Sequence, residues 1–272
     1  MFRESILISK LIFNSEVWYN VSNKQLEKLE QIDELYFRRI LNVAKTTPKV
    51  SIYMEFGIMP IRFIIKIRRL LYYWHILRRN KEELIFRFYT AQKYSPSEGD
   101  WVNQIIKDKA DIKLELSDAE IKSMSYYKFK KLVKRKVESF AILDLEARKK
   151  QKSMKLKISS FKPQEYILTK NLSISEVQNL FKIRNGMVDV KENFKSNNEN
   201  IWCRLCLICR ESQQHLLDCS KIREKLKDVI KFESLNIEMA HQSIKSQEIL
   251  AKNYTIILNA RSDIISQACG NQ

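Results

Sequence analysis

The chain has 272 residues, of which 49 are Lys or Arg and 32 are Asp or Glu, so its net charge is +17, and it contains only four Gly and four Pro. So few glycines argue against a Gly-rich phosphate loop, a dinucleotide-binding fingerprint or a series of tight hairpins. The abundance of Lys, Glu, Leu and Ile predicts an all-α fold. The positive charge predicts a polyanionic partner, either nucleic acid or an anionic membrane surface.

The hydropathy pattern predicts neither a membrane span nor a secretion signal. No segment reaches the roughly 18 uninterrupted apolar residues that cross a bilayer. The apolar stretch near the amino terminus contains a charge and lacks a small-residue cleavage site. We therefore expect an intracellular protein, nuclear or cytoplasmic, with no membrane partner, whose clustered cysteines are metal ligands rather than disulfides.

The first third of the chain predicts several helices. Residues 4–17 form an apolar-rich segment, and Ser22 with Gln25 resembles a capping box that opens a helix with apolar residues at helical spacing. Pro48 and Gly57 then interrupt the pattern. We expect residues 1–90 to form one helical domain.

Residues 61–79 are predicted to form a long helix with two distinct stripes. The apolar stripe includes Trp74, which is expected in the core, and the basic stripe contains Arg62, Lys66 and Arg69. Cations beside aromatic residues are typical of surfaces that follow a nucleic-acid backbone. These three cations are therefore candidate phosphate contacts.

A linker predicted at residues 92–101 lies at the start of a second expected segment, a basic helical connector over residues 91–164. Ser117 and Glu120 resemble a capping box that opens a helix running to about residue 150. Residues 122–157 carry 13 basic and 3 acidic residues. A solvated helical face is the alternative, but so large an imbalance repels itself unless a polyanion neutralises it, so we expect non-specific phosphate contacts. The densest candidates are Lys130, Lys131, Lys134, Arg135 and Lys136.

The last segment, residues 165–272, is expected to be a small helical domain stapled by zinc. A third capping box at Ser173 and Glu176 starts a helix that we expect Gly186 to end. Two further helices are predicted at about residues 221–233 and 245–267.

Three cysteines and a histidine have the spacing of a structural zinc site, Cys203-x2-Cys206-x8-His215-x3-Cys219. A Cys-x2-Cys turn can present two thiolates, and a His-x3-Cys step at a helix start can present two more ligands. Four protein ligands leave no position for a reactive water, which favours a metal that stabilises the fold. Cys209 leaves the ligand set open, because it could replace Cys206.

The residues around this motif resemble the C-terminal region of non-LTR retrotransposon reverse transcriptases. The metal motif reads Cys203-Arg-Leu-Cys206 and Gln214-His-Leu-Leu-Asp-Cys219. Upstream segments resemble the thumb of the same family in the expected order: Asn14-Ser-Glu-Val-Trp18, Arg38-Arg-Ile-Leu-Asn-Val43, Glu55-Phe-Gly-Ile-Met-Pro60 and Arg68-Arg-Leu70.

The resemblance implies a nucleic-acid-binding role without polymerisation. The chain has no aromatic-x-Asp-Asp sequence to hold two magnesium ions, and the family's palm would lie upstream of Met1. We therefore expect a protein that holds RNA or DNA during target-primed reverse transcription, with no catalytic residues and no small-molecule substrate, and whose partners include the missing reverse-transcriptase palm. Two alternatives stay open: a zinc-stapled scaffold for protein interactions, and a non-functional gene fragment with exposed apolar patches.

Overall fold

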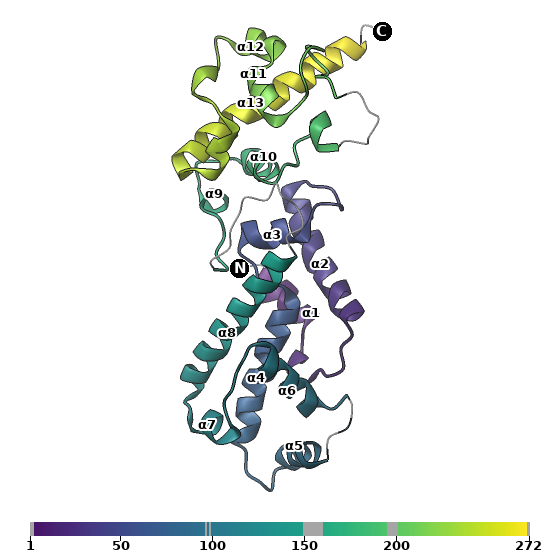
Figure 1. The fold of residues 1–272 in the computed structure, drawn as a ribbon, viewed down its shortest axis with the longest axis vertical. Helices are drawn as coiled ribbons and strands as arrows, with labels where there is room; N and C mark the ends of the chain where they lie inside the picture. Colours follow the sequence, from purple (N-terminus) through teal and green to yellow (C-terminus); the bar gives the residue numbers. More distant parts are fainter. Residues whose placement is uncertain (1–2, 96, 98, 149–159, 195–200, 271–272) are drawn as a thin grey trace. The chain divides into compact units, whose positions relative to one another are not determined.

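The protein is described by a computed structural model over residues 3–95, 97, 99–148, 160–194 and 201–270 (Figure 1). The described residues form helices and contain no β-strand, apart from one isolated bridge between Trp202 and Arg210. The predicted all-α class is confirmed. None of the helices in this described part is long and apolar enough to cross a membrane.

Contacts within the chain divide it into two compact units. Of the described residues, unit 1 contains those within 3–37, 57–148 and 160–162, and unit 2 contains those within 38–56, 163–194 and 201–270. The three predicted segments group the chain differently, because residues 38–56 belong to the C-terminal unit and the basic helix belongs to the same unit as the helix at residue 61.

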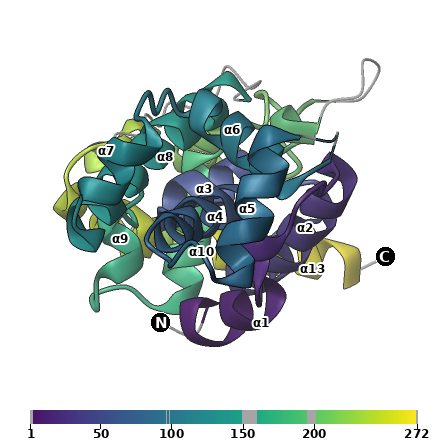
Figure 2. The same cartoon turned by 90° about the horizontal axis from the view of Figure 1, so that it is seen from below.

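The helices of unit 1 surround one central helix, α4 (Ile61–Leu77), which agrees with the predicted helix at residues 61–79. Figure 2 shows α5, α6, α7 and α8 arranged around it. The other elements of this unit are η1 (Arg3–Ile8), α1 (Ser9–Leu11), η2 (Ser15–Val17), the greater part of α2 (Asn23–Leu41), α5 (Leu84–Tyr94), α6 (Trp101–Asp111), α7 (Asp118–Ser123) and α8 (Tyr126–Ala147).

Helix α8 packs along α4 through residues spaced four apart. Phe129, Val133, Val137 and Ala141 are completely buried. Such spacing places side chains on one face of a helix, and the basic residues between them are left on the other faces. Trp74 is also in this core, as predicted, and is 8% exposed.

The prediction of a single basic helix from residue 117 to about residue 150 is wrong, because two non-helical residues separate α7 from α8. The predicted capping box at Ser117 and Glu120 does start α7. Met124 is extended and its carbonyl accepts a hydrogen bond from the Trp74 indole at 3.0 Å, while the Ser125 side chain accepts one from the backbone N–H of Lys128. Ser125 is thus a second N-cap, and α8 starts there.

Gly57 makes a turn that no other residue can make without strain. Its φ is +58°, and a Cβ at this position would overlap the backbone of Lys162. We expect Gly57→Ala to lower the free energy of unfolding by about 2–3 kcal/mol, since it combines left-handed backbone strain with a backbone clash. Gly99 provides the control: its φ is +91°, but a Cβ there would meet nothing closer than 3.7 Å. Gly99→Ala should lower the free energy of unfolding, measured with denaturant, by about 1 kcal/mol. If both substitutions lowered it equally, the role of the Lys162 contact would be contradicted.

Unit 2 is built around its longest helix, α13 (Ile244–Gly270), drawn in yellow in Figure 1. Leu250, Ala251, Tyr254 and Ile257 of this helix are fully buried. The other elements are α3 (Lys49–Phe56), α9 (Glu165–Leu168), α10 (Ile174–Arg184), η3 (Lys191–Phe194), α11 (Gln213–Asp218), α12 (Ser220–Leu226), η4 (Phe232–Ser234) and η5 (Ile237–His241).

Local signals set the ends of α10, whereas α12 is shorter than predicted. Ser173 and Glu176 form the expected capping box, and Gly186 follows the helix with a φ of +64°. The helix predicted over 221–233 ends at Leu226, and buried Ile230 and Phe232 reach the core from the turns that follow.

A buried ion pair joins α3 to α10 inside unit 2. The Arg184 Nε lies 3.0 Å from Glu55 Oε1, and both side chains are almost inaccessible to solvent. Asn185 donates a further hydrogen bond to the same carboxylate at 3.1 Å, and the backbone carbonyl of Glu55 accepts one from Gln164. Glu55 is therefore bound by partners that are distant in sequence.

Candidate metal centre

The loop that carries Cys203 and Cys206 is folded back on itself by backbone hydrogen bonds. The Cys203 N–H donates to the Cys209 carbonyl at 2.8 Å, and the Glu211 N–H donates to the Ile201 carbonyl at 2.9 Å. Leu207 adopts the left-handed conformation, with φ +59°. A side chain in this region indicates local strain, so the tight turn is maintained by its surroundings.

The other two candidate ligands lie at the two ends of one short helix. Ser212 caps α11 by accepting a hydrogen bond from the His215 N–H at 2.9 Å, which places His215 in the first turn. Cys219 follows the last residue of α11 and directly precedes α12. The His-x3-Cys spacing therefore spans one helical turn, and both side chains can face the cysteine loop.

The structure brings the four predicted side chains together. One ligand atom from each of Cys203, Cys206, His215 and Cys219 lies within 4.8 Å of the others. The Cys203 and Cys219 sulfurs are 3.9 Å apart, and Cys206 Sγ is 3.4 Å from His215 Nε2.

These separations match a tetrahedral metal site rather than a disulfide. Ligands at the usual Zn–S and Zn–N lengths would lie about 3.8 Å apart for two sulfurs and about 3.5 Å apart for sulfur and nitrogen. A disulfide requires about 2.05 Å between sulfurs. Cys209 is exposed and lies outside this group, so the geometry favours Cys206 as the fourth member.

Electrostatics in the cluster favour a cation. Burial alone would raise the pKa of the Cys206 thiol, but backbone N–H groups of Cys209 and Ile208, together with Cys203 and His215, outweigh it and lower the pKa to about 6. Burial and the neighbouring Cys203 raise the pKa of Cys219 to about 12. Two buried thiols side by side cannot both ionise cheaply without a compensating charge, which a divalent cation would supply.

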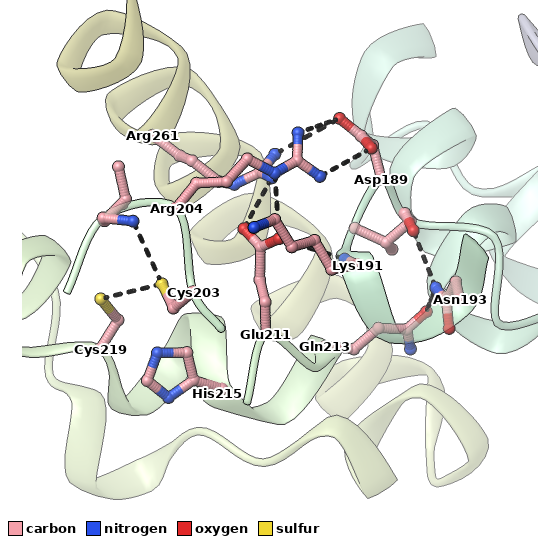
Figure 3. A network of polar contacts seen from close by, with 12 residues as sticks. Asp189, Lys191, Asn193, Cys203, Arg204, Glu211, Gln213, His215, Cys219 and Arg261 are labelled. Atoms are coloured by element: carbon pink, nitrogen blue, oxygen red, sulfur yellow. Dashed lines mark hydrogen bonds and ion pairs between the residues drawn. The ribbon is translucent and has the colours of Figure 1, made fainter. Parts of the chain in front are cut away.

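An ionic network anchors the cysteine loop to the rest of unit 2 (Figure 3). Arg204, between the two cysteines, contacts Glu211 Oε2 at 3.0 Å and Asp189 Oδ1 at 3.0 Å. Arg261 on α13 contacts the other oxygen of Glu211 at 2.9 Å. The Lys191 N–H also donates to Glu211 at 3.1 Å. The loop is thus connected to the longest helix through one buried carboxylate.

Sequence reasoning missed this network. The position of Arg204 within the Cys-x2-Cys turn is a signal that could have suggested an ordering role. Glu211 and Arg261 are 50 residues apart, and nothing local to either residue indicates that they meet.

The three basic candidates on α4 form ion pairs within unit 1. Arg62 Nε contacts Glu30 at 2.6 Å, and Arg69 Nε contacts the buried Asp108 at 2.8 Å. Lys66 lies between Asp108, at 3.5 Å, and Asp111. The positive charges of these three side chains are balanced by acidic partners inside the unit. Two acidic residues three positions apart near residue 110 are a sequence signal that could have revealed these partners.

The five basic candidates on α8 divide into two groups. Lys131, Lys134 and Arg135 are exposed, and no described residue pairs with their side chains. Lys130 lies over the Tyr126 ring at 5.5 Å, and Lys136 donates to the Lys113 carbonyl at 3.0 Å. The basic positions predicted at 149–157 lie outside the described residues.

Comparison with known proteins gives no match: no protein-family model, curated protein or solved structure is similar to this chain.

Proposed function

We propose that the chain is a non-catalytic nucleic-acid-binding protein with a structural Zn²⁺ site. Cys203, Cys206, His215 and Cys219 supply the four ligands. Sulfur-rich tetrahedral sets of this kind favour zinc, and a complete protein ligand set is typical of structural rather than catalytic zinc. Zinc would hold the cysteine loop against α11 and leave no position for an activated water.

The distribution of charge along the sequence supports a polyanion-binding surface in its first part. Residues 1–162 contain 34 basic and 19 acidic residues, whereas residues 163–272 contain 15 basic and 13 acidic residues. The metal-binding region is thus nearly neutral. The part of the sequence that contains α8 therefore attracts phosphates through charge more strongly than the part that contains the cysteines and histidine of the metal site.

The observation that carries this proposal is the outward face of α8. Residues 126–137 contain six basic residues and no acidic residue, and Phe129, Val133 and Val137 hold the opposite face in the core. A buried stripe of this kind fixes the helix, so the cations are presented on a rigid surface. Lysines on such a surface bind phosphates without reading sequence.

The resemblance to non-LTR retrotransposon proteins suggests a biological setting for this binding. In that setting the chain would hold RNA or DNA during target-primed reverse transcription, beside a reverse-transcriptase palm. Exposed apolar side chains in unit 1 support a missing partner of this kind: Phe13 is 69% and Tyr19 is 57% exposed.

A combined Lys131→Ala, Lys134→Ala and Arg135→Ala variant tests the phosphate-binding face. We expect it to weaken binding to RNA and DNA by about tenfold or more near 0.1 M salt and to reduce the slope of log K against log[salt] by about 2 to 3. Fluorescence anisotropy titrations at several salt concentrations measure both quantities.

The matched control removes three exposed lysines from unit 2, Lys227, Lys231 and Lys252. Its affinity and salt slope should stay close to those of the parent protein. Equal losses in both triple variants would indicate a general charge effect and contradict a specific face on α8.

A scaffold for protein interactions is the second candidate function. It is favoured by the tip of the cysteine loop, where Leu207 is 70% and Ile208 is 72% exposed. Exposed aliphatic side chains on a rigid turn can anchor a protein partner. If the parent protein does not bind RNA or DNA in a salt-dependent way, this function replaces the first.

A further inference from the structure

Tyr127 is an aromatic residue whose position in α8 is not explained by packing. Its side chain is 73% exposed. The neighbouring Tyr126, in contrast, lies 5.3 Å from the rings of both Trp74 and His75 and supports Lys130. Tyr127 makes no ring contact or side-chain hydrogen bond with any residue that the structure describes.

The helical register places Tyr127 on the same face as two of the exposed cations. Lys131 follows it by four residues and Lys134 by seven, and residues at these spacings lie in one stripe along a helix. The stripe extends over about 10 Å, because the helix rises about 1.5 Å per residue. No acidic residue occurs between Tyr126 and Val137. One exposed ring and two ammonium groups that pair with no described residue are therefore aligned on a rigid support.

We propose that Tyr127 stacks on an unpaired base while Lys131 and Lys134 contact neighbouring phosphates, so that this face selects single-stranded over double-stranded nucleic acid. The inference rests on the proposed function and deepens it. Charge alone does not distinguish the two forms, because both expose phosphates. An aromatic ring on the contact surface distinguishes a single strand from a duplex. Bases in a duplex are already stacked on one another, whereas a single strand offers free base faces to aromatic side chains.

The surroundings of Tyr127 favour nucleic acid over an apolar partner. Apart from Tyr126, the nearest exposed residues along α8 are Lys128, Lys131, Lys134 and Arg135, all of which carry positive charge. An apolar protein surface would have to desolvate these groups without neutralising them, which is costly. A single strand supplies both the anionic groups and the aromatic faces.

The test compares Tyr127→Ala with the parent protein on a 12-nucleotide oligouridylate, the matching oligothymidylate and a 12-base-pair duplex. We expect affinity for both single strands to fall by about 5- to 150-fold, as for the loss of one stacking contact. The affinity for the duplex and the salt slope for all three probes should be unchanged, since no charge is removed. Tyr127→Phe should retain single-strand binding, because the ring is kept.

Tyr94→Ala is the matched control, because Tyr94 is 80% exposed on α5 and lies outside this stripe. It should leave all affinities unchanged, and circular dichroism should show equal helix content in all variants. Equal weakening of single-strand and duplex binding in Tyr127→Ala, or no weakening at all, overturns the stacking proposal while leaving phosphate binding intact. Failure of the parent protein to bind any probe would instead overturn the proposed function, and this inference with it.

Discussion

Cys203→Ser is expected to abolish stoichiometric zinc binding and to unfold the cysteine loop. The Cys203 sulfur is fully buried, lies 3.9 Å from Cys219 and accepts a hydrogen bond from the Leu205 N–H. A serine hydroxyl is a poor ligand for a site of this kind, and zinc bound to folded peptides contributes about 10–16 kcal/mol of apparent binding free energy at neutral pH. The loss of stability should therefore exceed that caused by any surface substitution. Metal analysis of the purified protein and thermal unfolding with and without a chelator measure it.

Cys209→Ser is the matched control for this prediction, because the exposed Cys209 lies in the same loop but outside the cluster. It should retain one zinc per chain and the same response to chelator. If Cys209→Ser lost the metal and Cys206→Ser kept it, Cys209 would be the ligand. A parent protein that purifies without metal and cannot be loaded would exclude the zinc proposal itself.

Glu55→Ala is expected to destabilise unit 2 by about 3–5 kcal/mol, because it leaves the Arg184 guanidinium buried without its partner charge. Asn185 would lose an acceptor at the same time. Denaturant unfolding followed by circular dichroism measures the change, with the two units fitted as separate transitions.

An exposed ion pair provides the comparison. Glu83 lies 3.6 Å from Arg79, four residues earlier in the segment between α4 and α5, and both side chains are about half exposed. Glu83→Ala should lower the free energy of unfolding by at most about 0.5 kcal/mol. In the double variant Glu55→Leu and Arg184→Met, most of the loss should be recovered, since neither charge stays buried alone. Similar losses for Glu55→Ala and Glu83→Ala would show that the buried pair contributes little.

Local features of this protein could be predicted from the sequence. Ser173 and Glu176 lie three residues apart, and the cap they form depends on no distant group. The metal cluster could also be predicted, since its ligands lie within 17 residues of one another and their spacing fixes which side chains share a turn.

The features that the sequence did not reveal depend on distant partners. Arg69, one of the predicted phosphate contacts on α4, pairs with Asp108, 39 residues away. The helix predicted from residue 117 is interrupted at Met124, whose carbonyl accepts a hydrogen bond from the indole of Trp74, 50 residues earlier. Helical periodicity describes one segment at a time and cannot show which charge or donor packs against it.

The link from Arg204 through Glu211 to Arg261 would couple occupancy of the proposed metal site to the folding of unit 2. A ligand that binds only the folded state adds about 2.7 kcal/mol of stability at a free concentration one hundred times its dissociation constant. With zinc as that ligand, the fraction of folded chains in a cell would rise and fall with free zinc. Because unfolded chains are degraded, zinc supply would then control how much of the protein is present.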